Sequence, residues 1–335
     1  MLQLQRLLAQ DQNLDVQPVL KFSRWSRRKK IAELIQKPVQ LISPFLRDSG
    51  ISNSIYHGPD FRLNMSSRRG LKRIVTIHDF VVFNEQFSER KFTEQGQADM
   101  RDLLEAGDFD ALIVNSHFTH SEALKFFPVW KDRIYVTPLG SDREIGPQLQ
   151  NQKLPSKYIL FFGALELRKN VPNLIRAFEI LHQQGCEHFL VLAGVWGHGR
   201  ALIEKCISES SAKDKIIHLP YVKNTGVEQL YSQASALAFP SFYEGFGIPI
   251  VESMRFGTPV VTSDLGALRE VAGNAAEFVD PNYPDSIAQG LMKVLSSPER
   301  QAELRILGRR QAALFTWEKC AKLTAEVYKT VGRAK

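Results

Sequence analysis

The chain has 335 residues, of which 44% are hydrophobic and 24% are charged, as is usual for soluble globular proteins. The length favours two domains of roughly 100–200 residues each. The composition excludes collagen-like, coiled-coil and disordered proteins, and no apolar run approaches the roughly 20 residues that span a bilayer. Three cysteines, Cys186, Cys206 and Cys320, stand far apart without a C-x-x-C pair. This spacing predicts free thiols in a reducing cytoplasm rather than disulfides or a zinc site.

Positive charge gathers in the first part of the chain. Basic residues exceed acidic ones by seven overall, but residues 1–75 alone hold 14 basic and 5 acidic side chains. The densest stretch, residues 24–30, is a basic run that contains Trp25. One interpretation is a solvated basic face; another is contact with an anionic membrane surface, where each cation contributes about 1 kcal/mol. No nucleic-acid-binding module accompanies the run, so nucleic acid is not an expected partner.

Short apolar runs alternate with helical patterns along the first half, which is typical of α/β proteins with parallel sheets. The predicted strands are residues 15–22, 54–56, 74–77, 111–115 and 134–136. The predicted helices lie near residues 2–9, 92–106 and 119–126. The polar stretch over residues 141–157, with two prolines, is interpreted as a linker.

A second alternation of strands and helices follows the linker. Its predicted strands are residues 158–163, 189–193, 216–219, 236–239 and 259–262. Its predicted helices are residues 171–183, 227–233, 250–256, 284–297, 298–313 and 317–331. Two α/β units joined by a linker predict two Rossmann-like domains with a cleft between them. Ligands of such folds bind beyond the carboxyl ends of the strands.

Two stretches have the form of ligand motifs but are interpreted otherwise. The glycines of residues 194–199 follow a strand with G-x-x-G-x-G spacing, which is not the dinucleotide fingerprint, and no Walker-type loop occurs. Asp108-Phe109-Asp110 has the D-x-D form of a metal-diphosphate site. It directly precedes a predicted buried strand, however, so entry into that strand is the better interpretation. No metal site is expected.

The most informative stretch runs from Phe239 to Met254. A strand ends at Phe239, a glycine-rich turn follows, and a helix opens near Pro249, where proline suits the first turn. The amides of four consecutive residues would then face an anion at a helix N-terminus: Gly245, Phe246, Gly247 and Ile248.

Two carboxylates, Glu244 and Glu252, flank this turn eight positions apart. Carboxylates repel phosphate, so hydrogen bonding to sugar hydroxyls is the more plausible role for them. Together with the anion-binding amides, this predicts a nucleotide-sugar pocket. The alternative is a capped helix with incidental acidic residues.

Residues 240–252, PSFYEGFGIPIVE, resemble the Glu-x7-Glu motif of retaining glycosyltransferases of family GT4. Residues 163–170, GALELRKN, resemble the diphosphate loop of the same family. Further stretches match other motifs of that family, in order: residues 76–79, 114–116, 257–261, 268–271 and 315–317. The resemblance covers about residues 54–331.

This resemblance implies the GT-B fold. Residues 1–140 would form the acceptor-side domain and residues 141–316 the domain that binds the nucleotide sugar. The final helix, about residues 317–335, would pack back onto the first domain. Family members begin with a strand and a glycine-containing loop before the first helix, whereas this chain begins at what is predicted to be that helix. The N-terminal domain is therefore expected to lack its first strand.

The loop after the strand at residues 158–163 would hold the donor diphosphate. Transfer builds negative charge on the leaving diphosphate, which fixed cations and amides stabilise. Lys169 and Arg168 are the candidate cations, and Gly163 opens their loop. Many family members have arginine directly after that glycine, where this chain has Ala164, so Arg168 is expected to supply the second charge. A solvated helix start is the alternative, although a helix N-terminus disfavours cations.

The resemblance also assigns roles to other residues. Glu244 would contact hydroxyls of the donor sugar, and Glu252 those of the ribose. His78 would lie near the transferred sugar, and the backbone at Tyr221 and Val222 would contact the nucleobase. His57 also ends a predicted strand, and two interpretations stay open: a residue that lines the acceptor side, or a turn histidine.

The function implied is retaining transfer of a hexose from a nucleotide sugar to a saccharide or lipid-linked acceptor, without metal or other cofactor. The LExRKN form of the loop is similar to that of bacterial mannosyl- and rhamnosyltransferases. GDP-mannose is therefore the first donor expected, in surface polysaccharide synthesis such as that of lipopolysaccharide, on the cytoplasmic face of the membrane. A non-catalytic nucleotide-sugar-binding protein, or a truncated inactive transferase, is the alternative. A nucleotide-sugar 2-epimerase is disfavoured by the Glu-x7-Glu and FSW-like motifs.

Replacing the four residues Arg27 to Lys30 by glutamine is expected to lower binding to anionic vesicles without changing donor affinity. Exposed charges are screened over about 8 Å at physiological salt, so binding should need anionic lipid and weaken as salt rises. Co-sedimentation with anionic and neutral vesicles measures this. A wild-type protein that ignores anionic vesicles at low salt would identify the run as a solvated face.

Overall fold

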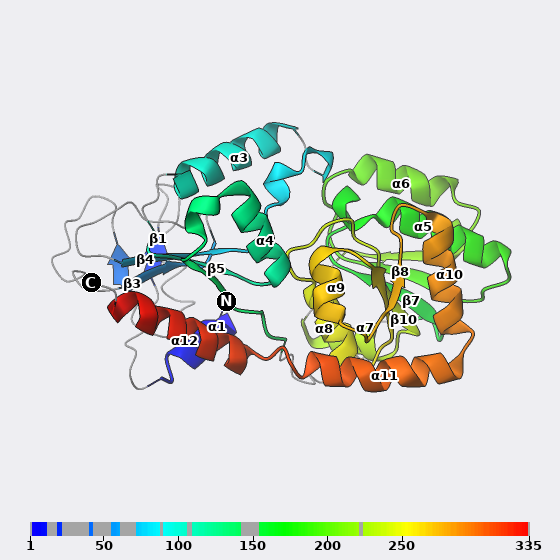
Figure 1. Ribbon diagram of the computed structural model, residues 1–335. Helices are drawn as coiled ribbons and strands as arrows, with labels where there is room; N and C mark the ends of the chain where they lie inside the picture. Colours follow the sequence, from blue (N-terminus) through cyan, green and yellow to red (C-terminus); the bar gives the residue numbers. More distant parts are fainter. Residues whose placement is uncertain are drawn as a thin grey trace.

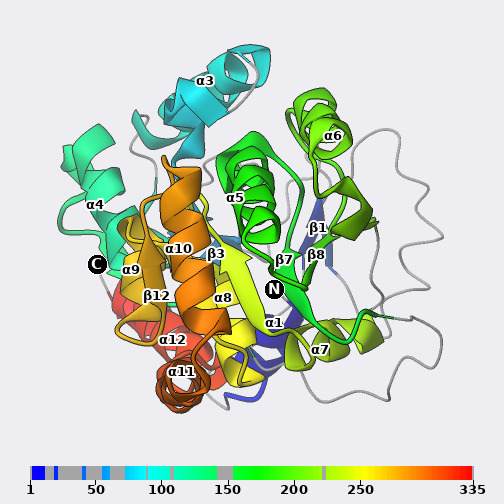
Figure 2. The same cartoon turned by 90° about the vertical axis from the view of Figure 1, so that its right-hand side faces the viewer.

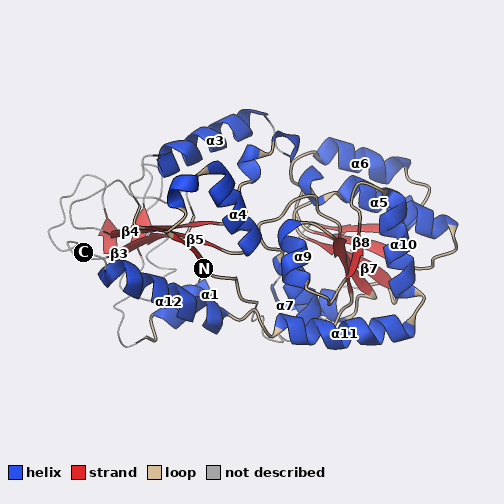
Figure 3. Cartoon of the chain, viewed as in Figure 1, coloured by secondary structure: helices blue, strands red, loops and turns tan. Residues whose placement is uncertain are grey.

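The computed structural model describes residues 2–11, 19–21, 40–42, 55–60, 72–87, 90–105, 109–141, 154–220 and 224–333. Within these ranges the chain has two lobes, each built around a parallel sheet (Figure 1; Figure 3). Some residues singled out in the sequence lie outside the described residues: the basic run at residues 24–30, Tyr221 and Val222, and Asp108 of the D-x-D stretch. No described helix is long and apolar enough to cross a membrane.

The first lobe contains a four-stranded parallel sheet in the order β3-β4-β5-β6 among the described strands. These are β3 (Ile55–Gly58), β4 (Lys72–Ile77), β5 (Ala111–Val114) and β6 (Ile134–Val136). Helices α3 (Arg90–Glu105) and α4 (His117–Phe126) belong to this lobe. Its core surrounds the buried Trp130, whose indole nitrogen donates to the carbonyl of Leu104 at 3.0 Å. Strands β1 (Val19–Lys21) and β2 (Gln40–Ile42) pair with each other in parallel.

The second lobe contains a parallel sheet whose described strands run in the order β12-β11-β10-β7-β8-β9. The strands are β7 (Tyr158–Phe162), β8 (Phe189–Ala193), β9 (Ile216–Leu219), β10 (Ala236–Phe239), β11 (Val260–Ser263) and β12 (Glu277–Val279). From β7 the chain continues to β8 and β9 on one side of the sheet, and from β10 it continues to β11 and β12 on the other side. The point between β7 and β10 is therefore the topological switch point, where α/β sheets bind ligands.

The helices of the second lobe are α5 (Val171–Gln183), α6 (Arg200–Glu209), α7 (Asn224–Ser232), α8 (Ile248–Arg255), α9 (Gly266–Ala272), α10 (Pro284–Leu295) and α11 (Pro298–Ala312). Helices α5 and α10 pack side by side over the sheet (Figure 2). In α5, a proline in the first turn and buried residues at helical spacing, from Val171 through Leu174 and Phe178 to Leu181, explain both its start and its packing.

Helix α12 (Trp317–Arg333) returns from the second lobe to the first, where Val327 and Val331 pack against the β4–β5 face of the sheet. Helix α1 (Leu2–Leu8) packs Leu4 and Leu8 onto α12. Where the chain crosses between lobes, the amide of Ser141 donates to the carbonyl of Phe315 at 3.2 Å. Two separate crossings thus connect the lobes.

His57 of strand β3 connects strand β4 to helix α12. Strand β3 continues to Gly58, so His57 lies within the strand and is not a turn histidine. Its Nδ1 lies 2.6 Å from the Tyr328 hydroxyl of α12, and its Nε2 lies 2.7 Å from the Thr76 hydroxyl of β4. Both ring nitrogens are therefore engaged within the protein, which leaves neither for an acceptor.

Burial, and secondarily the nearby His78, lower the pKa of His57 from 6.5 to about 4. Between these values the unfolded chain binds a proton that the folded chain excludes, so the free energy of unfolding falls as pH falls from about 6.5 to about 4. At 1.36 kcal/mol per pKa unit this contribution is about 3 kcal/mol. Denaturant unfolding of wild type and His57→Gln across this range should show a shallower pH dependence in the variant. Parallel pH profiles would contradict the assignment.

Candidate active site

The predicted site residues come from loops that follow β7 and β10, the two strands at the switch point. The β7 loop begins at Gly163, whose φ of +140° favours glycine, and a Cβ there would lie 3.0 Å from Nζ of Lys169. The lysine side chain thus folds back over the start of its own loop. Asn170 ends the loop in a left-handed conformation, and its side-chain amide donates to the carbonyls of Pro240 at 3.1 Å and Pro281 at 2.7 Å. These bonds fix the β7, β10 and β12 loops to one another.

The two candidate cations and Glu244 form one buried cluster. Arg168 Nη1 lies 2.8 Å from Glu244 Oε2, and Lys169 Nζ lies 3.3 Å from Glu244 Oε1. The guanidinium also donates to the carbonyl of Tyr243 at 2.7 Å and pairs with Glu166 at 3.1 Å. All these side chains are largely buried, so the ion pairs are little screened by solvent.

The pKa values of the cluster favour its charged form. Burial disfavours the Glu244 carboxylate, but Lys169 and then Arg168 outweigh it and hold the pKa of Glu244 below its usual range. Burial likewise opposes the charge of Arg168, but Glu244 and then Glu166 raise the pKa of the guanidinium. Arg168 is thus committed to protein oxygens, while Lys169 pairs with Glu244 among the described residues.

The first lobe contributes to this cluster through the segment after β4. Burial raises the pKa of Asp79, and Arg168 partly offsets that effect, so the two lie within electrostatic reach of each other across the lobes. The Asp79 carboxylate accepts from the amide of Val81 at 3.1 Å. Its neighbour His78 is half-buried, with Nε2 3.0 Å from the carbonyl of Pro59.

The β10 loop touches the first lobe directly. A Cβ on Gly245 would overlap the carbonyl oxygen of His78, so only glycine allows this approach. The amide of Phe80 donates to the hydroxyl of Tyr243 at 3.0 Å. The structure therefore brings His78 beside the loop that carries Glu244.

The start of α8 has the geometry expected of an anion site. Gly247 precedes the helix with φ of +102°, and within the described residues no hydrogen bond is donated by the amides from Gly245 to Ile248. Glu252 lies farther along α8, is 4% exposed, and accepts from the Tyr231 hydroxyl at 3.0 Å.

The structure thus brings together Gly163, Arg168, Lys169, Glu244 and the Gly245–Ile248 loop, with His78 opposite them. Sequence reasoning did not single out Glu166, Asp79, Tyr243 and Asn170. All four stand within the quoted motifs, so their positions could be read from the sequence. The contacts of Tyr243 and Asn170 could not, because their partners are distant in sequence.

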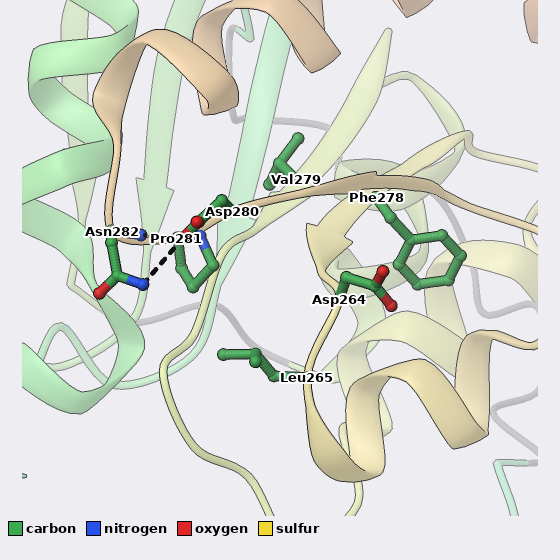
Figure 4. Close-up of a pocket in the computed structure, with 7 residues that line it drawn as sticks. All are labelled: Asp264, Leu265, Phe278, Val279, Asp280, Pro281 and Asn282. Carbon is green, nitrogen blue, oxygen red and sulfur yellow. Dashed lines mark hydrogen bonds between the residues drawn. The ribbon is translucent and has the colours of Figure 1, made fainter.

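A pocket of about 350 Å³ lies at the carboxyl ends of β11 and β12 (Figure 4). It is lined by Asp264, Leu265, Phe278, Val279, Asp280, Pro281 and Asn282. None of the predicted site residues lines it. It adjoins the cluster through Pro281, whose carbonyl accepts from Asn170.

Asp110 of the D-x-D stretch ties strands together. Its carboxylate accepts from the amide of Arg73 at 2.7 Å and pairs with Lys72 at 3.2 Å. Among the described residues, no three of the His, Cys, Asp and Glu side chains gather where they could hold a metal ion.

Comparison with known proteins identifies the family. Residues 142–311 match the family described as Glycosyl transferases group 1. The O-antigen chain mannosyltransferase B of Escherichia coli is 31% identical over 286 residues, which cover 82% of this chain and 74% of that protein. The chain belongs to this glycosyltransferase family. It is therefore a transferase enzyme.

Other relatives of this glycosyltransferase include the MMP alpha-(1->4)-mannosyltransferase of Mycolicibacterium hassiacum, 30% identical over 65% of this chain and 53% of that protein. Among solved structures, sucrose-phosphate synthase from Thermosynechococcus elongatus has a TM-score of 0.68 at 22% identity, over 82% of this chain and 73% of that one. HepE from Anabaena, in complex with UDP and glucose, has a TM-score of 0.63 at 18% identity, over 78% and 72%. The predicted GT-B fold of two Rossmann-like domains is confirmed.

Gly245→Ala should abolish most activity of this glycosyltransferase while the protein stays folded. The new Cβ would overlap the His78 carbonyl and force the lobes apart at the cluster. We expect turnover to fall by about 100-fold or more, since misplacement of the reacting groups by about 1 Å can have that effect. Gly332→Ala is the control, because among the described residues a Cβ there meets Ile55 alone, at 3.7 Å. Wild-type turnover in Gly245→Ala would show that the approach is not needed.

Proposed function

We propose that this glycosyltransferase transfers a hexose, with retention of configuration, from a nucleotide sugar to a saccharide or lipid-linked acceptor in bacterial surface polysaccharide synthesis. The observation that carries the proposal is the buried Lys169–Glu244–Arg168 cluster beside the anion-binding amides of the β10 loop. Mannose from GDP-mannose is the first donor proposed. The relatives named as mannosyltransferases support that choice.

In this mechanism Lys169 supplies the charge that stabilises the leaving diphosphate. Its ammonium is held 3.3 Å from Glu244 and lies over the ring of Phe239, 5.3 Å from its centroid. A charge already in place needs no reorganisation as the negative charge develops. The amides from Gly245 to Ile248 would hold phosphate oxygens in the same way.

Glu244 would act on the sugar. While Lys169 and Arg168 keep it ionised, its carboxylate can accept a hydrogen bond from a sugar hydroxyl with a remaining lone pair. Arg168, which already donates to Glu244 and to the Tyr243 carbonyl, would hold that carboxylate in place rather than grip a phosphate.

The remaining assignments follow from the family motifs. We propose that Glu252 contacts the ribose, that Tyr221 and Val222 contact the nucleobase, and that His78 lies near the transferred sugar. We also propose that the reaction needs no metal, so activity should survive a chelator. Loss of activity on chelation, restored by manganese, would contradict this.

Lys169→Ala should lower turnover at least about 100-fold, which is the typical effect of removing one preorganised group that stabilises developing charge. Transfer of labelled mannose from GDP-mannose to lipid-linked glycans measures it. Lys205→Ala is the matched control, because that lysine is exposed on α6 and pairs along its helix with Glu209. An unchanged turnover in Lys169→Ala would contradict the role proposed for Lys169. Donor binding by wild type without any transfer would favour the non-catalytic binding protein instead.

A further inference from the structure

Two family-like motifs have no part in the proposed mechanism, and they meet in the structure. Residues 114–116 end at Ser116, which caps α4 in the first lobe, and residues 268–271 contain Glu270 on α9 of the second lobe. The two oxygens of Glu270 accept from the amides of His117 and Phe118, both at 2.9 Å. These amides open α4, so a carboxylate of one lobe binds the N-terminus of a helix in the other. The helix dipole favours a negative charge there.

The first turn of α4 also holds the β10 loop. The hydroxyl of Ser116 donates to the carbonyl of Gly245 at 2.7 Å, and the hydroxyl of Thr119 donates to the same oxygen at 3.0 Å. These side chains are fully buried. Both lone pairs of the Gly245 carbonyl are therefore used by the first lobe.

Because the peptide bond is planar, the hydrogen bonds to the Gly245 carbonyl also fix the direction of the amide that follows it. The carbonyl of Gly245 and the amide of Phe246 belong to one rigid plane and point in opposite directions. Holding the carbonyl toward α4 therefore aims the Phe246 amide away from α4. That amide is one of those proposed to receive the donor phosphates, so α4 sets its direction from the opposite lobe.

The packing around these bonds is close and continuous. A Cβ on Gly266, at the start of α9, would lie 2.9 Å from the ring of Phe118. That ring in turn meets Tyr243 edge-on, with centroids 5.6 Å apart. A shift of α4 relative to α9 would therefore displace Tyr243 and its neighbour Glu244.

We infer that Glu270, Ser116 and Thr119 form an inter-lobe latch that positions the donor-binding loop. Glu270 holds the first turn of α4 onto α9, and the two hydroxyls hold the Gly245 carbonyl. None of the three needs to touch substrate, so they are positioning residues. The inference rests on the proposed function only in naming the loop as the donor site.

The first test needs no substrate. Glu270→Gln keeps the size of the side chain but removes its charge and one of its two acceptors. In hydrogen–deuterium exchange of the full chain, we expect faster exchange in peptides covering residues 117–126 and also in those covering residues 240–250. Glu204→Gln, on the exposed face of α6, is the matched control. Faster exchange confined to residues 117–126 would overturn the latch and leave Glu270 a simple helix cap.

The second test is kinetic. Glu270→Gln and the double variant Ser116→Ala/Thr119→Val should each lower kcat/KM for the donor by about tenfold, an ordinary strength for coupling between sites. Combining Glu270→Gln with the double variant should lower kcat/KM little further, because either change alone already releases the contact that positions the loop. Ser121→Ala, an exposed α4 serine, is the control. Unchanged kcat/KM alongside altered exchange would overturn the positioning role. Absence of transfer in wild type would instead refute the proposed function, with the exchange result unaffected.

Discussion

The buried carboxylate of Glu244, shared between Lys169 and Arg168, is the interaction on which the site depends. An isolated charge is costly to bury, and removing one partner of a buried pair leaves the other uncompensated. Glu244 thus allows two adjacent cations to stay charged in a largely buried position. Arg168 is further bound to Glu166 and to the Tyr243 carbonyl, which is why Lys169 is the cation that we propose for the diphosphate.

The contact between the lobes serves the same cluster. Gly245 lies against the backbone of His78, and Tyr243 accepts from Phe80, so the loop that carries Glu244 is placed by both lobes. Asp79 adds a carboxyl from the first lobe within electrostatic reach of Arg168. The site therefore depends on how the lobes are held together, which gives the hydrogen bonds between α9 and α4 their importance.

Much of the fold could be predicted from periodicity, because the apolar runs of β7, β8, β10 and β11 are central strands that are almost wholly buried. Strands β8, β9 and β10 and helix α5 match the predicted bounds. Strand β12 was missed because it has three residues and begins with Glu277. That glutamate is buried only because Arg300 and Lys293, from two later helices, pair with it. Helix α9 was missed because it opens on Gly266, which is typical of a turn.

The candidate site likewise has features that the sequence predicts and features that it does not. The positions of Lys169, Glu244 and Gly245 on loops between a strand and a helix could be predicted from short motifs, since such a turn fixes local backbone geometry; their roles stay proposals. The contacts of Arg168 with Tyr243 and Glu244 could not be predicted, because they are tertiary contacts between the β7 and β10 loops. His57 was predicted at a strand end. Strand β3 instead extends through His57 to Gly58, and the hydroxyls of Thr76 and Tyr328 make the partly buried imidazole a bridge between β4 and α12.

The most direct test of this account is calorimetric titration of GDP, which lacks the sugar, into wild type and Glu244→Gln, with UDP as a second probe. If Glu244 is the counter-ion that a diphosphate replaces at Lys169, the variant should bind the nucleoside diphosphate at least as tightly as wild type. Its transfer activity should nevertheless be largely lost, because the sugar has lost its carboxylate. Markedly weaker nucleoside diphosphate binding in Glu244→Gln would contradict the account.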